Sequence, residues 1–104
     1  MGTKTILIIL LGSLIWSLTM IRSGLNYSYG VGFWGANGHD GVWHLALSES
    51  LSAGSFENPI FAGEALKNYH FGFDLMLALI NQVTKIPINY LYFQILPPIF
   101  ALLI

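Results

Sequence analysis

Three long apolar stretches dominate the hydrophobic pattern of the chain. The first covers residues 5–21 without a charge and lies between Lys4 and Arg22. The second runs from about residue 69 to 83, and the third from about residue 88 to 104. Uncharged runs of about 17–25 apolar residues are typical of membrane-spanning helices. The pattern therefore predicts an all-α fold of polytopic transmembrane helices.

The predicted organisation has four parts. Residues 1–22 form the first transmembrane helix, and residues 23–68 form a long extracytoplasmic loop with a short amphipathic helix at about 41–53. Residues 69–86 form the second transmembrane helix and a cytoplasmic turn, and residues 87–104 form a third, truncated helix. The last apolar run stops without a polar anchor, so we expect an incomplete chain.

The first apolar stretch also permits a second interpretation, as a cleaved signal peptide. Such a peptide likewise begins with a positive residue and a short apolar core. No Ala-x-Ala-like cleavage site follows here, and Ser17-Leu18-Thr19 is the nearest approach to one. We therefore favour a retained helix.

Composition supports a membrane environment. The 104 residues are 55% hydrophobic and 9% charged, whereas soluble domains carry about 25% charged residues. The net charge of −1 supplies no basic patch for phosphates, which argues against nucleic acid as a partner. The chain has no cysteine, which excludes disulfides, thiolate zinc sites and thiol nucleophiles.

The charge distribution predicts an orientation in the membrane. Lys4 precedes the first apolar stretch and Lys85 lies in the turn after the second. The segment between these stretches carries two basic and four acidic residues: Arg22 and Lys67 against Asp40, Glu49, Glu57 and Glu64. Cytoplasmic loops are the ones enriched in lysine and arginine. We expect an integral protein of the plasma (inner) membrane, with a cytoplasmic amino terminus and loop 23–68 outside.

Asp40 is the first candidate for chemistry. It opens the predicted loop helix, and His44 and Ser48 follow on the same stripe at four-residue steps. One interpretation is that Asp40 only caps the helix by accepting hydrogen bonds from first-turn amides. In the other, its carboxylate accepts a proton from a substrate hydroxyl or binds a divalent cation. Metal binding by His39, Asp40 and His44 matches no strong zinc signature.

A second polar group lies around the start of the second apolar stretch. Lys67, His70, Asp74 and Asn81 are spaced by three, four and seven residues, which places them on one face if the segment is helical. An ionisable residue within a membrane helix needs a polar cavity or a partner. We expect Asp74 to find such a partner in a residue like His70.

The order of these features is also familiar from a known family. An acidic residue opens the loop helix, and small residues, a proline, a glycine and a basic-aromatic segment follow it. The segments concerned are Asp40-Gly41-Val42-Trp43-His44, Ser52-Ala53-Gly54, Asn58-Pro59, Gly63 and Lys67-Asn68-Tyr69-His70-Phe71. In this order the chain resembles the amino-terminal region of GT-C membrane glycosyltransferases, in particular the aminoarabinose transferase and protein mannosyltransferase branch.

Three positions depart from that family pattern. Gly41 stands where the family has a second acidic residue, and His44 stands where an aromatic residue is common. Asn68-Tyr69 replaces two prolines.

The resemblance implies transfer of a sugar from a polyprenyl-phosphate donor to an acceptor hydroxyl on the outer membrane face. Asp40 is then the catalytic base or acceptor-orienting group, and His44, Lys67 and His70 bind substrate. The implied partners are the lipid bilayer, the lipid-linked donor and the remaining helices of the full-length protein. A divalent cation is the one candidate cofactor, and the fragment alone is not expected to be active.

Two other classes of function fit the same residues. A transporter or channel segment would use Asp74 and the proline pair at 97–98 to line a polar path. A small membrane scaffold would need neither Asp40 nor Asp74 for chemistry.

Overall fold

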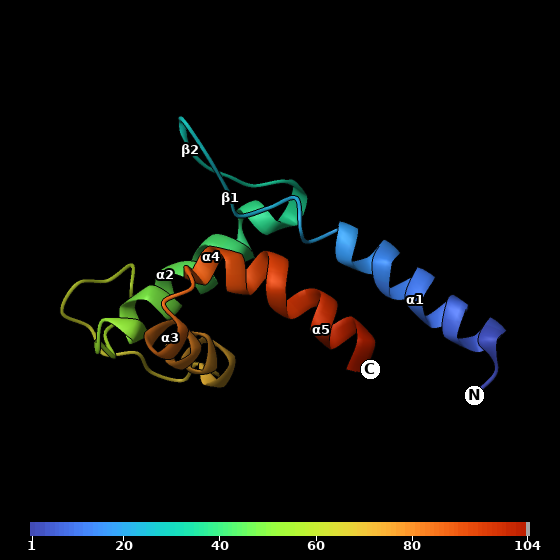
Figure 1. Ribbon diagram of the computed structural model, residues 1–104. Helices are drawn as coiled ribbons and strands as arrows, with labels where there is room; N and C mark the ends of the chain where they lie inside the picture. Colours follow the sequence, from blue (N-terminus) through green and yellow to red (C-terminus); the bar gives the residue numbers. More distant parts are fainter. Residues whose placement is uncertain (104) are drawn as a thin grey trace.

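The structure is a computed structural model that describes residues 1–103, and of Ala36 the backbone alone. It consists of two helical groups that a small hairpin connects (Figure 1). In chain order the elements are α1 (Thr3–Leu18), β1 (Leu25–Tyr27), β2 (Gly30–Gly32), the 3-10 helix η1 (Gly35–Gly38), α2 (Asp40–Ser52), α3 (Gly72–Thr84), α4 (Ile88–Tyr90), the π-helical turn η2 (Leu91–Ile95) and α5 (Leu96–Leu103).

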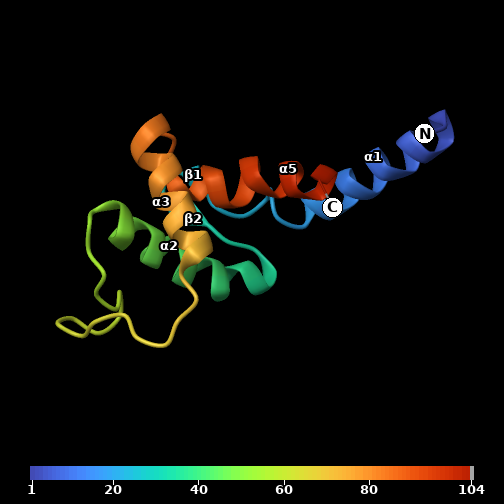
Figure 2. The ribbon, with the colours of Figure 1, turned by 90° about the horizontal axis from the view of Figure 1, so that it is seen from below.

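The last three elements, α4, η2 and α5, follow one another directly and form a single rod. The start of the rod packs against α2 and α3, and its end, α5, packs against α1. At one end of the molecule α2 and α3 pack together, while α5 runs beside α1 toward the other end. The Ser13 hydroxyl donates to the carbonyl of Ala101 at 3.0 Å and joins α1 to α5. Figure 2 shows the amino-terminal part of α1 projecting past the end of α5.

The apolar core lies on the two sides of α3. On one side Leu77 packs with the buried residues Ile88, Leu91 and Leu96 of the rod. On the other side Ala78 packs against Leu47 and Leu51 of α2. Because α3 contributes to both clusters, it holds α2 in a fixed position relative to the rod.

The side chain of Phe93, which is fully buried, fixes how the rod meets the start of α2. A Cβ atom at Gly24 would lie 2.2 Å from this ring, and one at Gly41 would lie 2.6 Å from it. Glycine at both positions therefore makes room for the ring. Gly24 also has a φ of +73°, which favours glycine in its own right.

Polar side chains of the rod hold the link between α1 and the hairpin. The Gln94 amide donates to the carbonyls of Ile21 at 3.0 Å and Ser23 at 2.5 Å. One turn earlier, the Asn89 amide donates to the carbonyl of Gly24 at 2.7 Å. These bonds satisfy backbone groups that have no helix or sheet partner.

The all-α prediction is wrong, because β1 and β2 form an antiparallel hairpin with Leu25 opposite Gly32. The turn closes into a hairpin because Gly30, with a φ of +131°, supplies a backbone conformation that other residues rarely adopt.

The prediction of polytopic transmembrane helices is also wrong for the described part of the chain. No helix within residues 1–103 combines the length and the hydrophobicity needed to cross a membrane. The 16 residues of α1 measure about 24 Å at the α-helical rise, against about 30 Å for a hydrocarbon core. The second stretch yields only the 13 residues of α3, and a π-helical turn interrupts the third.

Candidate functional site

The central feature is a row of polar contacts between α2 and α3, which we call the polar ladder: His44, Ser48 and Ser52 facing Asp74 and Asn81. His44 Nδ1 lies 2.8 Å from Asp74 Oδ1, to which the Ser48 hydroxyl donates at 3.2 Å. The Ser52 hydroxyl donates to Asn81 Oδ1 at 2.6 Å. The four-residue spacing along α2 aligns these side chains.

Asp74 is fully buried, with no exposed side-chain surface, as is Ser48 of the same ladder. Its Oδ1 atom serves both donors, while its Oδ2 atom is buried and has no hydrogen-bond partner among residues 1–103. A buried carboxylate is costly unless it is paired and hydrogen-bonded. The two donors on α2 therefore explain how α3 tolerates an aspartate in an apolar helix.

His44 lies between two tyrosine rings. The Tyr92 ring stacks on the imidazole at a centroid distance of 5.7 Å and an interplanar angle of 23°. The centroid of the Tyr69 ring lies 6.4 Å from that of the imidazole, and the two rings are tilted by 46°. The His44 side chain remains 26% exposed, so its imidazole is held by neighbouring side chains and still reaches solvent.

Burial raises the pKa of Tyr92 above its ordinary value, and the negative charges of Asp74 and Asp40 raise it further. The phenol therefore stays protonated near neutral pH, as a neutral ring against His44.

Asp40 occupies the first turn of α2, but its carboxylate makes no capping hydrogen bond; the N-cap position belongs to His39. Asp40 Oδ1 lies 3.0 Å from His39 Nδ1, with side-chain exposures of 81% for Asp40 and 96% for His39. The interpretation of Asp40 as only a capping residue is therefore wrong. Its carboxylate is available to a ligand.

A groove of about 350 Å³ opens beside Asp40. Its lining residues combine polar and apolar side chains: His39, Asp40, Val42, Trp43, Ala46 and Ile60. Trp43 is held edge-on by Tyr69 at a centroid distance of 5.4 Å. The exposed carboxylate of Asp40 therefore borders a groove that is lined in part by the packed Trp43 ring.

Of the predicted polar face of Lys67, His70, Asp74 and Asn81, only Asp74 and Asn81 lie in α3. Since α3 begins at Gly72, Lys67 and His70 lie outside the helix, in the exposed segment before it. Asn68 in that segment has a φ of +54°, which is incompatible with a continuous helix. Within residues 1–103 no hydrogen bond or ion pair joins Lys67 or His70 to Asp40 or His44.

The partner of Asp74 is His44 and not His70, so the predicted partner is wrong, and neither this pair nor the tyrosines beside it were predicted. A signal was present, because the His44 stripe on α2 and the Asp74 face of α3 each needed a polar partner. The simplest arrangement that gives both faces a polar partner packs the His44 stripe of α2 against the Asp74 face of α3.

The backbone of Gly41 lies close to the Phe93 ring. The Phe93 ring occupies the space where a side chain at this position would begin. A second acidic residue has no room here, so Asp40 carries the carboxylate of this turn alone.

No group of three or more histidine, cysteine, aspartate or glutamate side chains that could hold a metal ion is found in the described part of the chain. Comparisons with protein-family models, curated proteins and solved structures find no match for this chain.

Proposed function

We propose that this chain is the amino-terminal part of a glycosyltransferase that moves a sugar from a polyprenyl-phosphate donor to an acceptor hydroxyl at the outer membrane face. The observation that carries the proposal is the exposed carboxylate of Asp40, which makes no capping hydrogen bond and lies at the start of a rigid helix beside a groove. The resemblance of the loop motif to GT-C transferases supplies the reaction class.

Sugar transfer needs the chemistry that a carboxylate provides. The sugar carbon becomes positively charged as its bond to phosphate breaks, and a fixed negative charge nearby stabilises that state. The carboxylate of Asp40 also accepts a hydrogen bond from an acceptor hydroxyl and so orients it. Its position on α2, which α3 holds against the rod, keeps this geometry rigid.

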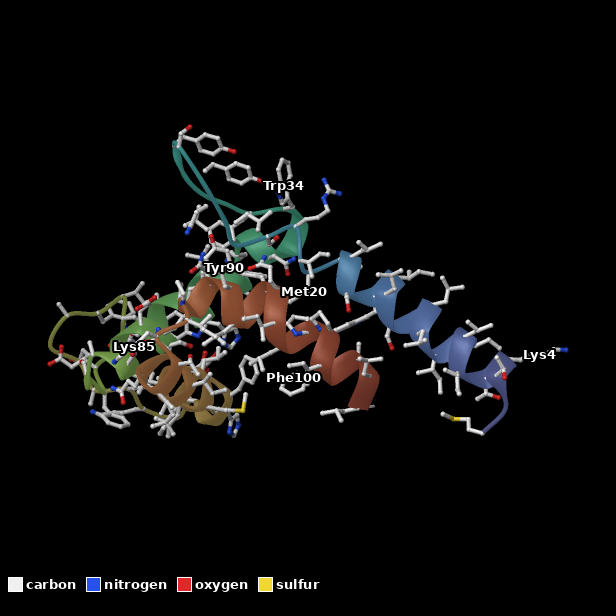
Figure 3. All side chains as sticks on the ribbon, viewed as in Figure 1. Lys4, Met20, Trp34, Lys85, Tyr90 and Phe100 are labelled. Atoms are coloured by element: carbon white, nitrogen blue, oxygen red, sulfur yellow. The ribbon has the colours of Figure 1, made fainter. Side chains whose placement is uncertain are left out.

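The apolar surface supports a lipid environment for this reaction. Along α1 large apolar side chains are exposed around the whole helix, among them Leu7 at 60%, Ile8 at 71% and Ile15 at 58%. A helix that is apolar on all sides needs an apolar surrounding. Positive residues flank it: Lys4 at its free end, labelled in Figure 3, and Arg22, which lies 5.4 Å from the ring of Trp34. We propose that the exposed apolar surface of α1 lies against lipid.

The experiment that tests the proposal compares two donor classes. Membranes containing the full-length protein are incubated with a radiolabelled polyprenyl-phosphate sugar or with the corresponding nucleotide sugar, and label on acceptor hydroxyls is counted. We expect label only from the lipid-linked donor. Equal transfer from the nucleotide sugar, or no transfer from a panel of lipid-linked sugars, contradicts the proposal.

A further inference from the structure

Two histidine–carboxylate pairs in this protein use the same atoms but differ in burial. His44 Nδ1 lies 2.8 Å from Asp74 Oδ1, with side-chain exposures of 26% and 0%. His39 Nδ1 lies 3.0 Å from Asp40 Oδ1, with exposures of 96% and 81%. Water competes with an exposed pair and leaves it weak. Only the buried pair can therefore hold an imidazole in one orientation.

The donors and acceptors around Asp74 define which nitrogen of His44 carries the proton. A carboxylate only accepts hydrogen bonds, so Nδ1 of His44 must be the protonated donor to Asp74. In a neutral imidazole the other nitrogen, Nε2, then carries a free lone pair.

That second nitrogen is open to a ligand. Nε2 of His44 makes no hydrogen bond within residues 1–103. It is also not sealed inside the protein, because the buried unpartnered side-chain atoms of the described chain are Asp74 Oδ2 and Gln94 Oε1.

We propose that His44 is the general base of the site and that Asp74 is its positioning residue. This inference rests on the proposed sugar transfer. The attacking hydroxyl gives its proton to His44 Nε2, and the electron pair of its oxygen forms the bond to the sugar carbon. The bond from that carbon to the phosphate oxygen breaks, and its electron pair leaves with the phosphate. The imidazolium keeps its Nδ1 proton, which Asp74 holds, and later releases the Nε2 proton to solvent.

The arrangement on α2 suits this division of roles. Asp40 and His44 are four residues apart on α2, a spacing that places Cβ atoms about 5–6 Å apart on one helix face. His44 does not line the groove beside Asp40, so an acceptor that reaches both side chains must extend one turn along α2 beyond that groove. Asp40 then supplies the negative charge that stabilises the sugar, while His44 takes the proton. Imidazole is well suited to proton transfer near neutral pH.

The ring geometry of Tyr92 keeps the base in place. Its stacking on His44 opposes rotation of the imidazole out of the line set by Asp74. A general base works only when it is held within hydrogen-bond reach of the proton it removes.

The first test reads the position of the proton directly. In the full-length protein labelled with ¹⁵N-histidine and kept at alkaline pH, NMR distinguishes Nδ1–H from Nε2–H imidazoles. We expect His44 to show Nδ1–H and an unprotonated Nε2, and Asp74→Asn to change that signal. His39 serves as the internal control and should show the mixture of a solvated histidine. A His44 signal with Nε2–H, or one that matches His39, overturns the inference whatever the activity of the protein.

The second test measures transfer with the lipid-linked donor. His44→Ala should lower the rate about 10²- to 10⁴-fold, the usual contribution of a general base, and added imidazole should restore part of it. Imidazole should not rescue Asp40→Asn. His44→Asn, which keeps a donor for Asp74 but lacks Nε2, covers the case in which the alanine variant fails to fold.

The outcomes separate the two proposals. If Asp40→Asn is impaired while both His44 variants transfer sugar normally, the general base is wrong and the proposed function stands. If the native protein transfers no sugar from any lipid-linked donor, the proposed function is wrong. In that case the role of His44 as the base for sugar transfer is also wrong.

Discussion

His44 on α2 and Asp74 on α3 lie 30 residues apart in sequence, yet His44 Nδ1 and Asp74 Oδ1 are 2.8 Å apart across the packed helices. This contact joins the helix that carries Asp40 to the helix that anchors the core. It gives the buried carboxylate a structural role that can be measured separately from any chemistry.

Asp74→Ala should lower the free energy of unfolding strongly. It leaves the donors of the half-buried His44 and the buried Ser48 without their acceptor, a loss that costs about 1–3 kcal/mol. Asp40→Ala is the matched control, since that carboxylate is 81% exposed and its loss should cost less than about 1 kcal/mol. Denaturant unfolding in a mild detergent measures both. Equal losses for the two variants contradict the burial difference.

Gly41→Ala should destabilise the protein by about 1–3 kcal/mol, the usual cost of overpacking. The new methyl group would lie 2.6 Å from the Phe93 ring, and Phe93→Leu in the same chain should recover part of the loss. Gly12→Ala is the control, because a Cβ atom there meets nothing within 4 Å. Thermal unfolding of these three variants and the native protein provides the comparison, and an unchanged stability of Gly41→Ala contradicts the close contact.

Tyr92 should be a late-titrating tyrosine, because its pKa is raised by burial and then by Asp74 and Asp40. A raised pKa means that the folded state holds the phenol proton more tightly than the unfolded chain. Its contribution to stability is present below the unfolded value of 10.0 and is lost as pH rises through the folded value. Tyrosinate absorbance should lose its last-titrating component in Tyr92→Phe. An unchanged titration curve contradicts the assignment.

Ile8→Glu should weaken binding of the protein to lipid vesicles at least about tenfold. It replaces with a charge an exposed apolar side chain whose burial in lipid contributes about 1.5–3 kcal/mol to binding. Val83→Glu is the control, since Val83 is 83% exposed on α3 and lies away from α1. Sedimentation with vesicles measures both. Equal effects at the two positions contradict the placement of α1 in lipid.

Local patterns in the sequence were sufficient to locate the helix at Asp40. The structure begins α2 at this residue, where the pattern predicts a helix start, and it keeps His44 and Ser48 on one stripe. Such features depend on spacing along one helix, so they can be read from neighbouring residues.

Features that depend on distant contacts could not be read in this way. Asn68 has a left-handed backbone and α3 begins only at Gly72, so Lys67 and His70 lie outside the helix. The pairing of Asp74 with His44 needs the tertiary packing of α2 on α3, which periodicity does not specify. The long uncharged apolar runs predicted spanning helices, but α1 ends at Leu18 and a π-helical turn lies within the third stretch.

Sugar transfer by Asp40→Asn at matched protein abundance tests the proposed role of Asp40. Asparagine keeps the size of the side chain but removes the negative charge beside the groove. We predict a rate at least about 10²-fold lower than the native rate, as for the loss of one stabilising group at a charged transition state, while the control Glu57→Gln stays near native. An Asp40→Asn protein that folds normally and transfers sugar at the native rate contradicts the proposed role of Asp40.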